Sequence, residues 1–301
     1  MKTSHILLYL VGTMLIACSG RNSDYDASGS FEATEIIVSS EANGKLLHLD
    51  ITEGQHLEKG QVVGSIDSTQ LYLQKMSLQA NARGVRAQQP NISTQTAAIE
   101  EQIATLERER ARTQNLIKEN AANQKQLDDI NSQIEVLRNQ LSAQKSTLQK
   151  STANISAQSS AMEIQAAQID DLLEKCIIAS PITGTVLNKY AEAGELAGQG
   201  TPLFKVADIN NMILRAYVTN DQLSQLKLNN KVEVWVDAGD GKMRSYEGTL
   251  SWISDKAEFT PKTIQTKNER ANLVYAIKIN VPNDGYLKIG MYGEVKFTKN
   301  D

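Results

Sequence analysis

Apolar residues recur every seven positions along two polar, glycine-poor stretches of the chain. The first series is Leu71, Leu78, Val85, Ile92, Ile99 and Leu106, and the second is Leu127, Ile134, Leu141, Leu148, Ile155, Met162 and Ile169. A seven-residue repeat keeps one side of an α-helix against a partner helix and winds the pair left-handed. Because polar residues 118–123 separate the series, we predict an antiparallel coiled-coil hairpin over residues 68–175, with arms roughly 75 Å long.

This hairpin predicts three facing pairs of seam residues: Leu106 with Ile134, Ile99 with Leu141, and Leu71 with Ile169. Pro90 interrupts the first arm, because proline lacks a backbone N–H and clashes with the preceding helical turn. The seven-residue spacing nevertheless continues across Pro90. The sequence therefore predicts a kink or local break near residues 88–91, and not the end of the arm.

The segments on either side of the predicted hairpin repeat each other. Glycines separated by ten and then six residues occur in both copies: Gly44, Gly54 and Gly60 before the hairpin, and Gly184, Gly194 and Gly200 after it. We expect these glycines to supply the positive φ that tight turns between short strands need. Two such halves, residues 40–67 and 176–208, would face each other in a small β-sandwich of the biotinyl/lipoyl type.

The last part of the chain, residues 209–301, shows the spacing of a small β-barrel. Short runs of alternating or continuous apolar residues predict strands at 212–219, 231–236, 246–253, 273–281 and 293–298. Asn220 is the expected N-cap of a short helical turn over 221–226, and Asp240-Gly241 signals a hairpin. The predicted fold class is α+β: a coiled-coil hairpin inserted in a split lipoyl-like β-sandwich, followed by a β-barrel that the strand 31–39 joins.

The N-terminus carries a targeting signal. The apolar run from Ile6 to Ile16 is too short to span a bilayer and has the length of a signal-peptide core. Leu15-Ile16-Ala17-Cys18 resembles the bacterial lipobox, which implies removal of residues 1–17 and lipidation of Cys18. Residues 18–30 are rich in Ser, Gly, Asn and Asp, as in a flexible tether. The alternative is an ordinary secretory signal in which Cys18 is incidental.

Composition argues against catalysis and nucleic-acid binding. The 301 residues carry a net charge of −4, which does not suit a polyanionic partner. The three histidines lack the spacing of metal ligands, and there is no phosphate loop or nucleophile elbow. Cys176 is expected to be a packed thiol. We therefore expect no enzymatic activity, metal or cofactor.

The chain resembles a known family. A lipoyl-like domain split by a helical hairpin is similar to the HlyD-family periplasmic adaptors, or membrane fusion proteins. Several segments carry this resemblance: 31–36 leading into Gly44, 179–184, 257–262, 273–279 and Gly290-Met291. The segments 257–262 and 273–279 are similar to the subgroup that accompanies ABC-type exporters.

The resemblance implies a periplasmic protein that is lipid-anchored to the cell membrane, more specifically the inner membrane. It would link an inner-membrane ABC-type exporter to an outer-membrane TolC-like channel for efflux or secretion. A conduit through the adaptor implies a homo-oligomeric ring, with a hexamer as the family's usual form.

The resemblance also marks three residues at the hairpin tip. Arg112, Leu116 and Asn123 match the family's Arg–Leu–Ser tip motif, with Asn in place of Ser. In the family this motif contacts the outer-membrane channel. The alternative is that Arg112 is a solvated helix residue and Leu116 only covers the end of the hairpin core.

Three other functions are alternatives to this adaptor role. An adaptor of an RND- or MFS-type pump would share most of these features. A structural envelope coiled-coil lipoprotein would have no reason to contain the split repeat. A biotin or lipoyl carrier would place a modified lysine where the two half-motifs meet, and here the whole hairpin occupies that junction.

Overall fold

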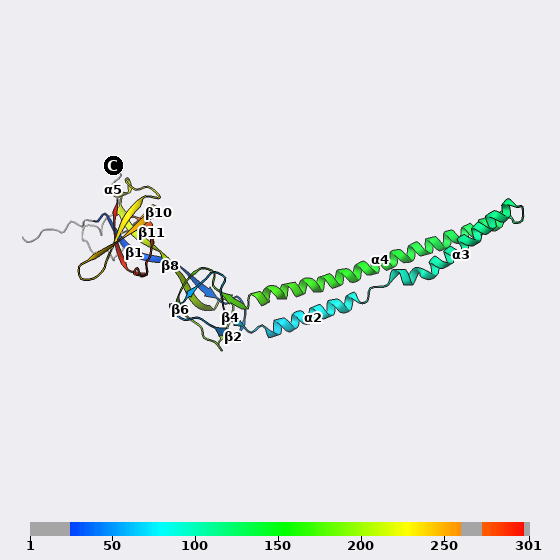
Figure 1. The fold of residues 1–301 in the computed structure, drawn as a ribbon, viewed down its shortest axis with the longest axis horizontal. Coiled ribbons are helices and arrows are strands. Elements are labelled where there is room, and N and C mark those ends of the chain that lie inside the picture. Colours follow the sequence, from blue (N-terminus) through cyan, green and yellow to red (C-terminus); the bar gives the residue numbers. More distant parts are fainter. Residues whose placement is uncertain (1–24, 260–272, 298–301) are drawn as a thin grey trace, which may run out of the picture.

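The computed structural model describes residues 25–259 and 273–297. The predicted signal peptide, Cys18 and most of the predicted tether lie outside these residues, as do positions 260–262 of the 257–262 segment. Three parts follow one another along the molecule: a β-barrel, a β-sandwich and a long helical hairpin (Figure 1). This arrangement confirms the predicted fold class.

The hairpin consists of three helices, α2 (Thr69–Arg86), α3 (Ile92–Lys118) and α4 (Gln124–Glu174). α2 and α3 together form the first arm, and α4 forms the second arm as one helix of 51 residues. At the helical rise its length is about 75 Å. The first arm is broken over residues 87–91, around Pro90, as the sequence predicts.

The seam between the arms uses the predicted series and a second row of residues. One apolar cluster lies in the outer half of the hairpin and contains residues of both rows: Ile99, Ile103, Leu106, Ile130, Ile134, Leu137 and Leu141. Ile103, Ile130 and Leu137 form the second row, and each lies three or four residues from members of the predicted series. This alternation of three and four is what keeps a helix pair in contact on every turn.

Ion pairs between the arms fix their register. Lys75 on α2 pairs with Asp170 on α4, and Glu100 on α3 pairs with Lys145 on α4. Lys75 and Glu100 are 25 residues apart on the first arm, and their partners Asp170 and Lys145 are also 25 residues apart on α4, in the opposite direction. The Glu107–Arg138 pair continues this register toward the tip.

The sandwich is built by strands from one half of the repeat pairing with strands from the other. Its strands are β2 (Gly44–Leu49), β3 (His56–Leu57), β4 (Val62–Ile66), β5 (Ile177–Ala179), β6 (Gly184–Lys189) and β7 (Leu196–Ala197). β2 pairs with β7, β3 with β6, and β4 with β5. Its core contains Leu46, Leu57, Ile66, Val186, Leu203 and Phe204. The hairpin is thus inserted between two halves whose strands pair with each other.

Two of the six glycines predicted to lie in turns do not do so. Gly54, Gly60, Gly194 and Gly200 have positive φ, as predicted. Gly44 and Gly184 instead begin strands β2 and β6 without positive φ. There the neighbouring chain comes so close that a Cβ on Gly184 would lie 2.4 Å from the carbonyl oxygen of Ala207. A Cβ on Gly44 would lie 2.7 Å from the Cγ2 atom of Ile66. Close approach of another part of the chain, and not turn geometry, is the physical reason for glycine at these two positions.

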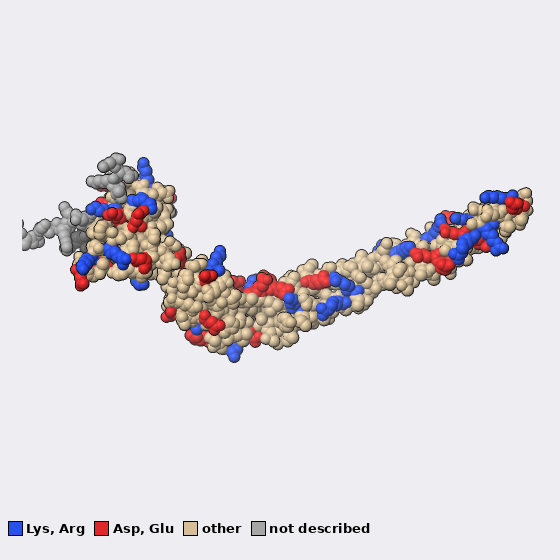
Figure 2. Space-filling view, viewed as in Figure 1, with Lys and Arg blue, Asp and Glu red and all other residues tan. Residues whose placement is uncertain are grey.

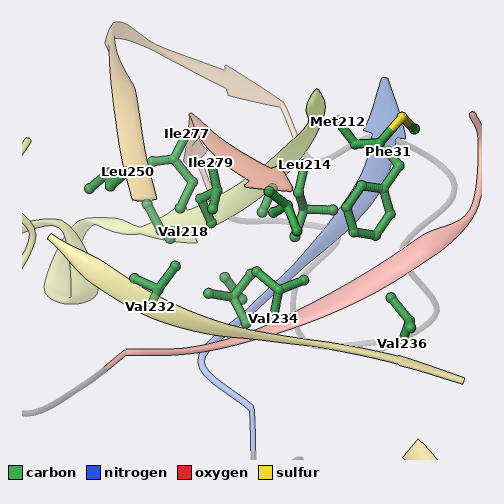
Figure 3. Packing of buried hydrophobic residues seen from close by; sticks show 14 of the residues in the cluster. Phe31, Met212, Leu214, Val218, Val232, Val234, Val236, Leu250, Ile277 and Ile279 are labelled. Atoms are coloured by element: carbon green, nitrogen blue, oxygen red, sulfur yellow. The ribbon is translucent and has the colours of Figure 1, made fainter. Parts of the chain in front are cut away.

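The barrel closes on itself. Its strands are β1 (Ala27–Ser39), β8 (Pro202–Thr219), β9 (Lys231–Asp237), β10 (Met243–Phe259), β11 (Leu273–Pro282) and β12 (Tyr292–Phe297). They pair in the order β1-β12-β9-β10-β11-β8, and β8 pairs again with β1. Side chains from these strands converge inside the barrel, among them Phe31, Leu214, Val234 and Ile277 (Figure 3).

The strands β1 and β8 belong to both β domains. They pair from Ser28 with Tyr217 in the barrel to Ser39 with Pro202 in the sandwich. Because β1 begins at Ala27, residues 27–30 are part of a strand and not of the predicted tether. The predicted boundary between sandwich and barrel at residue 209 falls inside β8, so this strand crosses it.

Local details of the barrel follow the sequence, with one exception. Asp240 and Gly241 have positive φ in the turn between β9 and β10. The short helix α5 (Asn220–Leu223) is capped by Thr219, and not by Asn220 as predicted. Thr219 and Gln222 form a reciprocal capping box, which satisfies two helix-end N–H groups and so places the cap one residue earlier.

Candidate functional site

The hairpin tip is a tight turn formed by backbone hydrogen bonds. Ala121 N–H donates to the carbonyl of Leu116 at 2.8 Å, and Asn120 N–H donates to that of Ile117 at 3.0 Å. Asn120 itself has a positive φ of 57°, in the left-handed region. This pair of bonds around a left-handed residue is the Schellman motif, which satisfies the last carbonyls of a helix. It ends α3 sharply and turns the chain into α4.

Asn123 begins the second arm. Its side-chain oxygen accepts a hydrogen bond from Lys125 N–H at 3.0 Å, so Asn123 is the N-cap of α4. The oxygen of this residue is therefore used within the hairpin, while its amide nitrogen remains able to donate outward. Ser would cap the helix equally well.

Arg112 and Leu116 lie one turn apart on α3, and both are exposed. The Leu116 side chain is 40% exposed, although leucine ordinarily packs inward. Thr113, between them in sequence, is buried and points toward the seam. The structure thus brings Arg112 and Leu116 together on one outward face, and it places Asn123 across the turn at the start of α4.

This face can bind a partner through two kinds of contact. The exposed Leu116 side chain offers apolar surface, and the Arg112 guanidinium offers several N–H donors in a planar fork. Within the described part of the chain, Arg112 makes no ion pair. Charges of both signs surround the tip, which lies at the end of the molecule opposite the barrel (Figure 2). The arrangement suits recognition of another protein.

The described residues offer no sign of a chemical centre. They contain no cluster of three or more His, Cys, Asp or Glu side chains placed to hold a metal. Cys176 is buried in the sandwich, and burial, together with the nearby Asp67 carboxylate, raises the pKa of its thiol. A thiol with a raised pKa is a poor nucleophile.

Sequence reasoning missed the turn that forms the tip. Asn120 is the residue in the left-handed conformation, and Asn after the last helical turn is a known signal for this ending. The ion pairs between the arms were also missed. They could have been found by testing which charged residues face each other once the register is fixed.

A family model matches the sequence and the observed architecture. The model of the RND MFP barrel-sandwich hybrid domain matches residues 34–208, which include the sandwich and the hairpin.

Proteins called UPF0194 membrane proteins are similar over most of the chain. One from Yersinia pseudotuberculosis is 26% identical, over 97% of this chain and 96% of its own length. Another, from Acidithiobacillus ferridurans, is 26% identical over 87% of this chain and 83% of its own.

Two solved structures share the fold. MacA from Actinobacillus actinomycetemcomitans superimposes with a TM-score of 0.55 and 21% identity, over 91% of this chain and 78% of that one. The membrane fusion protein Spr0693 from Streptococcus pneumoniae R6 gives a TM-score of 0.52 and 18% identity, over 91% and 98%. None of the helices in the described ranges 25–259 and 273–297 is long and apolar enough to cross a membrane.

Proposed function

Because this chain belongs to the RND membrane fusion protein family, whose members are non-enzymatic adaptors of efflux systems, we propose that it links an inner-membrane exporter to an outer-membrane channel. The barrel and the sandwich would lie on the exporter side, and the hairpin would reach across the periplasm. The tip would dock on the channel.

The observation that carries this proposal is the placement of an exposed leucine and an arginine without an ion pair, among the described residues, at the far end of a long arm. Arg112 and Leu116 lie near the end of α3, beyond the apolar cluster that holds the arms together. They are not needed to close that cluster. Exposed apolar and guanidinium groups on one face are typical of binding surfaces.

The exporter class and the anchor are finer parts of the proposal. Resemblance of residues 257–262 and 273–279 to one subgroup supports an ABC-type exporter, while the name of the matching family model supports an RND pump as the alternative. The lipobox-like Leu15–Cys18 segment supports lipidation of Cys18, and the family resemblance supports a place on the inner membrane. Mass spectrometry of the mature protein tests the anchor: an acylated Cys18 without residues 1–17 is expected, and an unmodified N-terminus elsewhere would contradict it.

We also propose that copies assemble into a ring, with six as the expected number from the family resemblance. An adaptor that encloses a conduit needs such closure. Native mass spectrometry of the detergent-extracted complex would reveal the number of copies.

The sharpest experiment is crosslinking from the tip in living cells. A photoreactive residue at Leu116 should capture an outer-membrane channel protein, while the same residue at Val136, which is exposed on α4 beside the outer-half cluster, should capture it much less. Equal capture from both positions, or none from Leu116 in cells that export normally, would contradict docking through the tip.

A further inference from the structure

Only one of the two arms is interrupted, and the helix that begins after the interruption has its own N-cap. Residues 87–91 separate α2 from α3, while α4 runs past them unbroken. At the end of α2, Ala87 N–H donates to the carbonyl of Arg83 at 2.9 Å. At the start of α3, the Asn91 side chain accepts from Thr94 N–H at 3.2 Å. The first arm is therefore made of two complete helices, and not of one distorted helix.

The break does not change the pairing of the arms. Lys75–Asp170 lies on the sandwich side of the break, and Glu100–Lys145 lies on the tip side in the same register. Each of the two half-arms is thus held to α4 by its own contacts. A continuous helix through residues 87–91 would be compatible with the same register.

Packing beside the break involves small and polar side chains. Gln89 Nε2 donates to Ser156 Oγ at 2.9 Å on the exposed side, and Ser159 Oγ donates to the carbonyl of Ala82 at 3.3 Å inside the seam. The Thr152 hydroxyl is buried and has no hydrogen-bond partner among the residues that the structure describes. Small and polar side chains bury little apolar area, so opening this part of the seam costs little hydrophobic free energy.

Large apolar contacts lie on either side of this region. The outer half of the hairpin has its own cluster around Ile103 and Ile134. At the other end, Leu71 packs against the core of the sandwich. The two apolar clusters, one in the outer half of the hairpin and one in the sandwich, are therefore joined by α4 and by a broken first arm.

We propose that residues 87–91 are a bending point at which the outer half of the hairpin pivots against the inner half. Because α4 is continuous and keeps its length, only the broken arm can shorten or lengthen, so the bend lies in the plane that contains the two arms. With helix axes 8–10 Å apart, a bend of about 30° would change the length of the broken arm by about 5 Å and that of α4 much less. The bend would aim the tip at its partner, and in this respect it rests on the proposed function.

Pulsed electron paramagnetic resonance of spin-labelled cysteine pairs tests the bend in the full chain. One pair, Asn81→Cys with Gln102→Cys, spans the break. The matched pair, Ala143→Cys with Ile164→Cys, spans the same stretch of α4. All four positions are exposed, and each pair is 21 residues apart. Cys18→Ser leaves Cys176 as the single native cysteine, and Cys176 is buried and so protected from labelling.

The pair across the break should give a distance distribution at least twice as wide as the α4 pair, which should be narrow and centred near about 31 Å. Pro90→Ala with Asn91→Ala removes the proline and the cap, and should narrow the first distribution to the width of the second. Equal widths in the unaltered arm would overturn the proposal, as would an unchanged width in the variant when circular dichroism shows added helix. If the variant does not fold, the comparison of the two pairs alone decides. No exporter or channel is needed, so the result is independent of the proposed function.

Discussion

Glu100 on α3 and Lys145 on α4 form an ion pair between the arms, with 2.7 Å between the Glu100 Oε1 and Lys145 Nζ atoms. The hydrogen bond from Lys145 is the main cause that lowers the pKa of the Glu100 carboxyl, and the Thr96 hydroxyl adds a smaller contribution. A carboxyl whose pKa is lower in the folded protein adds stability above its unfolded pKa. That stability is lost as the pH falls through the folded pKa.

Acid should therefore loosen the hairpin at this pair. Between pH 7 and a pH below about 4, near the ordinary pKa of glutamate, the melting temperature of the helical signal should fall. Glu100→Gln should lower the melting temperature slightly at pH 7 and reduce its dependence on acid, measured by circular dichroism. Glu109→Gln, at an exposed position on the same helix, is the control. An equal change in both variants would show that the pair has no specific role.

The seam should depend on Ile134. This side chain is 2% exposed within the outer-half cluster, so Ile134→Ala should lower the free energy of unfolding by about 2–5 kcal/mol through lost contacts and a cavity. Val136→Ala, at a position 64% exposed, should change it by less than about 0.5 kcal/mol. Chemical denaturation followed at the helical signal gives both values. Similar losses from the two variants would mean that the seam is misplaced.

Gly184 should tolerate substitution less well than Gly194. Gly184→Ala would bring the new Cβ to 2.4 Å from the Ala207 carbonyl oxygen, a backbone atom that can move only if β8 moves. Gly194→Ala meets no atom within 4 Å and costs only the strain of positive φ, about 1–3 kcal/mol. Thermal melting and limited proteolysis of the sandwich should rank Gly184→Ala as the more damaging. The reverse order would contradict the close-approach explanation.

The tip should be required for export and not for folding. Arg112→Asp with Leu116→Ser removes the donor fork and the apolar contact, and it should abolish export and channel capture while the melting temperature stays within a few degrees. Arg83→Asp, on an exposed face of α2 far from the tip, is the control. Efflux assays beside pull-down of the channel give the readout. Normal export by the double variant would favour a purely structural role for the coiled coil.

Asn123 offers a separate test of the third tip position. Asn123→Ser should leave both stability and export unchanged, because Ser keeps the N-cap of α4. Asn123→Ala should lower stability by about 1 kcal/mol through loss of that cap. If Asn123→Ser blocks export without changing melting, the amide itself contacts the partner.

Periodicity predicted the hairpin well because a seven-residue repeat constrains many residues at once. The break at Pro90 was also predictable, since proline excludes one backbone hydrogen bond wherever it stands. The second seam row was missed because Ile103 and Ile130 belong to shorter series that small and polar residues interrupt. Positive φ was the wrong explanation for Gly44 and Gly184. The close approach that requires glycine there depends on neighbouring parts of the chain that the sequence repeat does not identify.

The candidate site was predictable in position only. The spacing of Arg112 and Leu116 on one helix places them on the same face, and their distance from the seam makes them exposed. What they contact is a property of another molecule, and no pattern within this chain encodes its shape. The Asn220 cap was misplaced for a related local reason, since the choice between Thr219 and Asn220 depends on where Gln222 points.

The two strands shared by the barrel and the sandwich have a mechanical consequence. Any pull applied through the chain before Ala27 enters β1, and β1 is bonded along its length to β8 in both domains. Such a load acts parallel to the strands, so many backbone hydrogen bonds resist it together and none is peeled alone. The sandwich from which the long arm projects is therefore braced against tension by the same two strands that close the barrel.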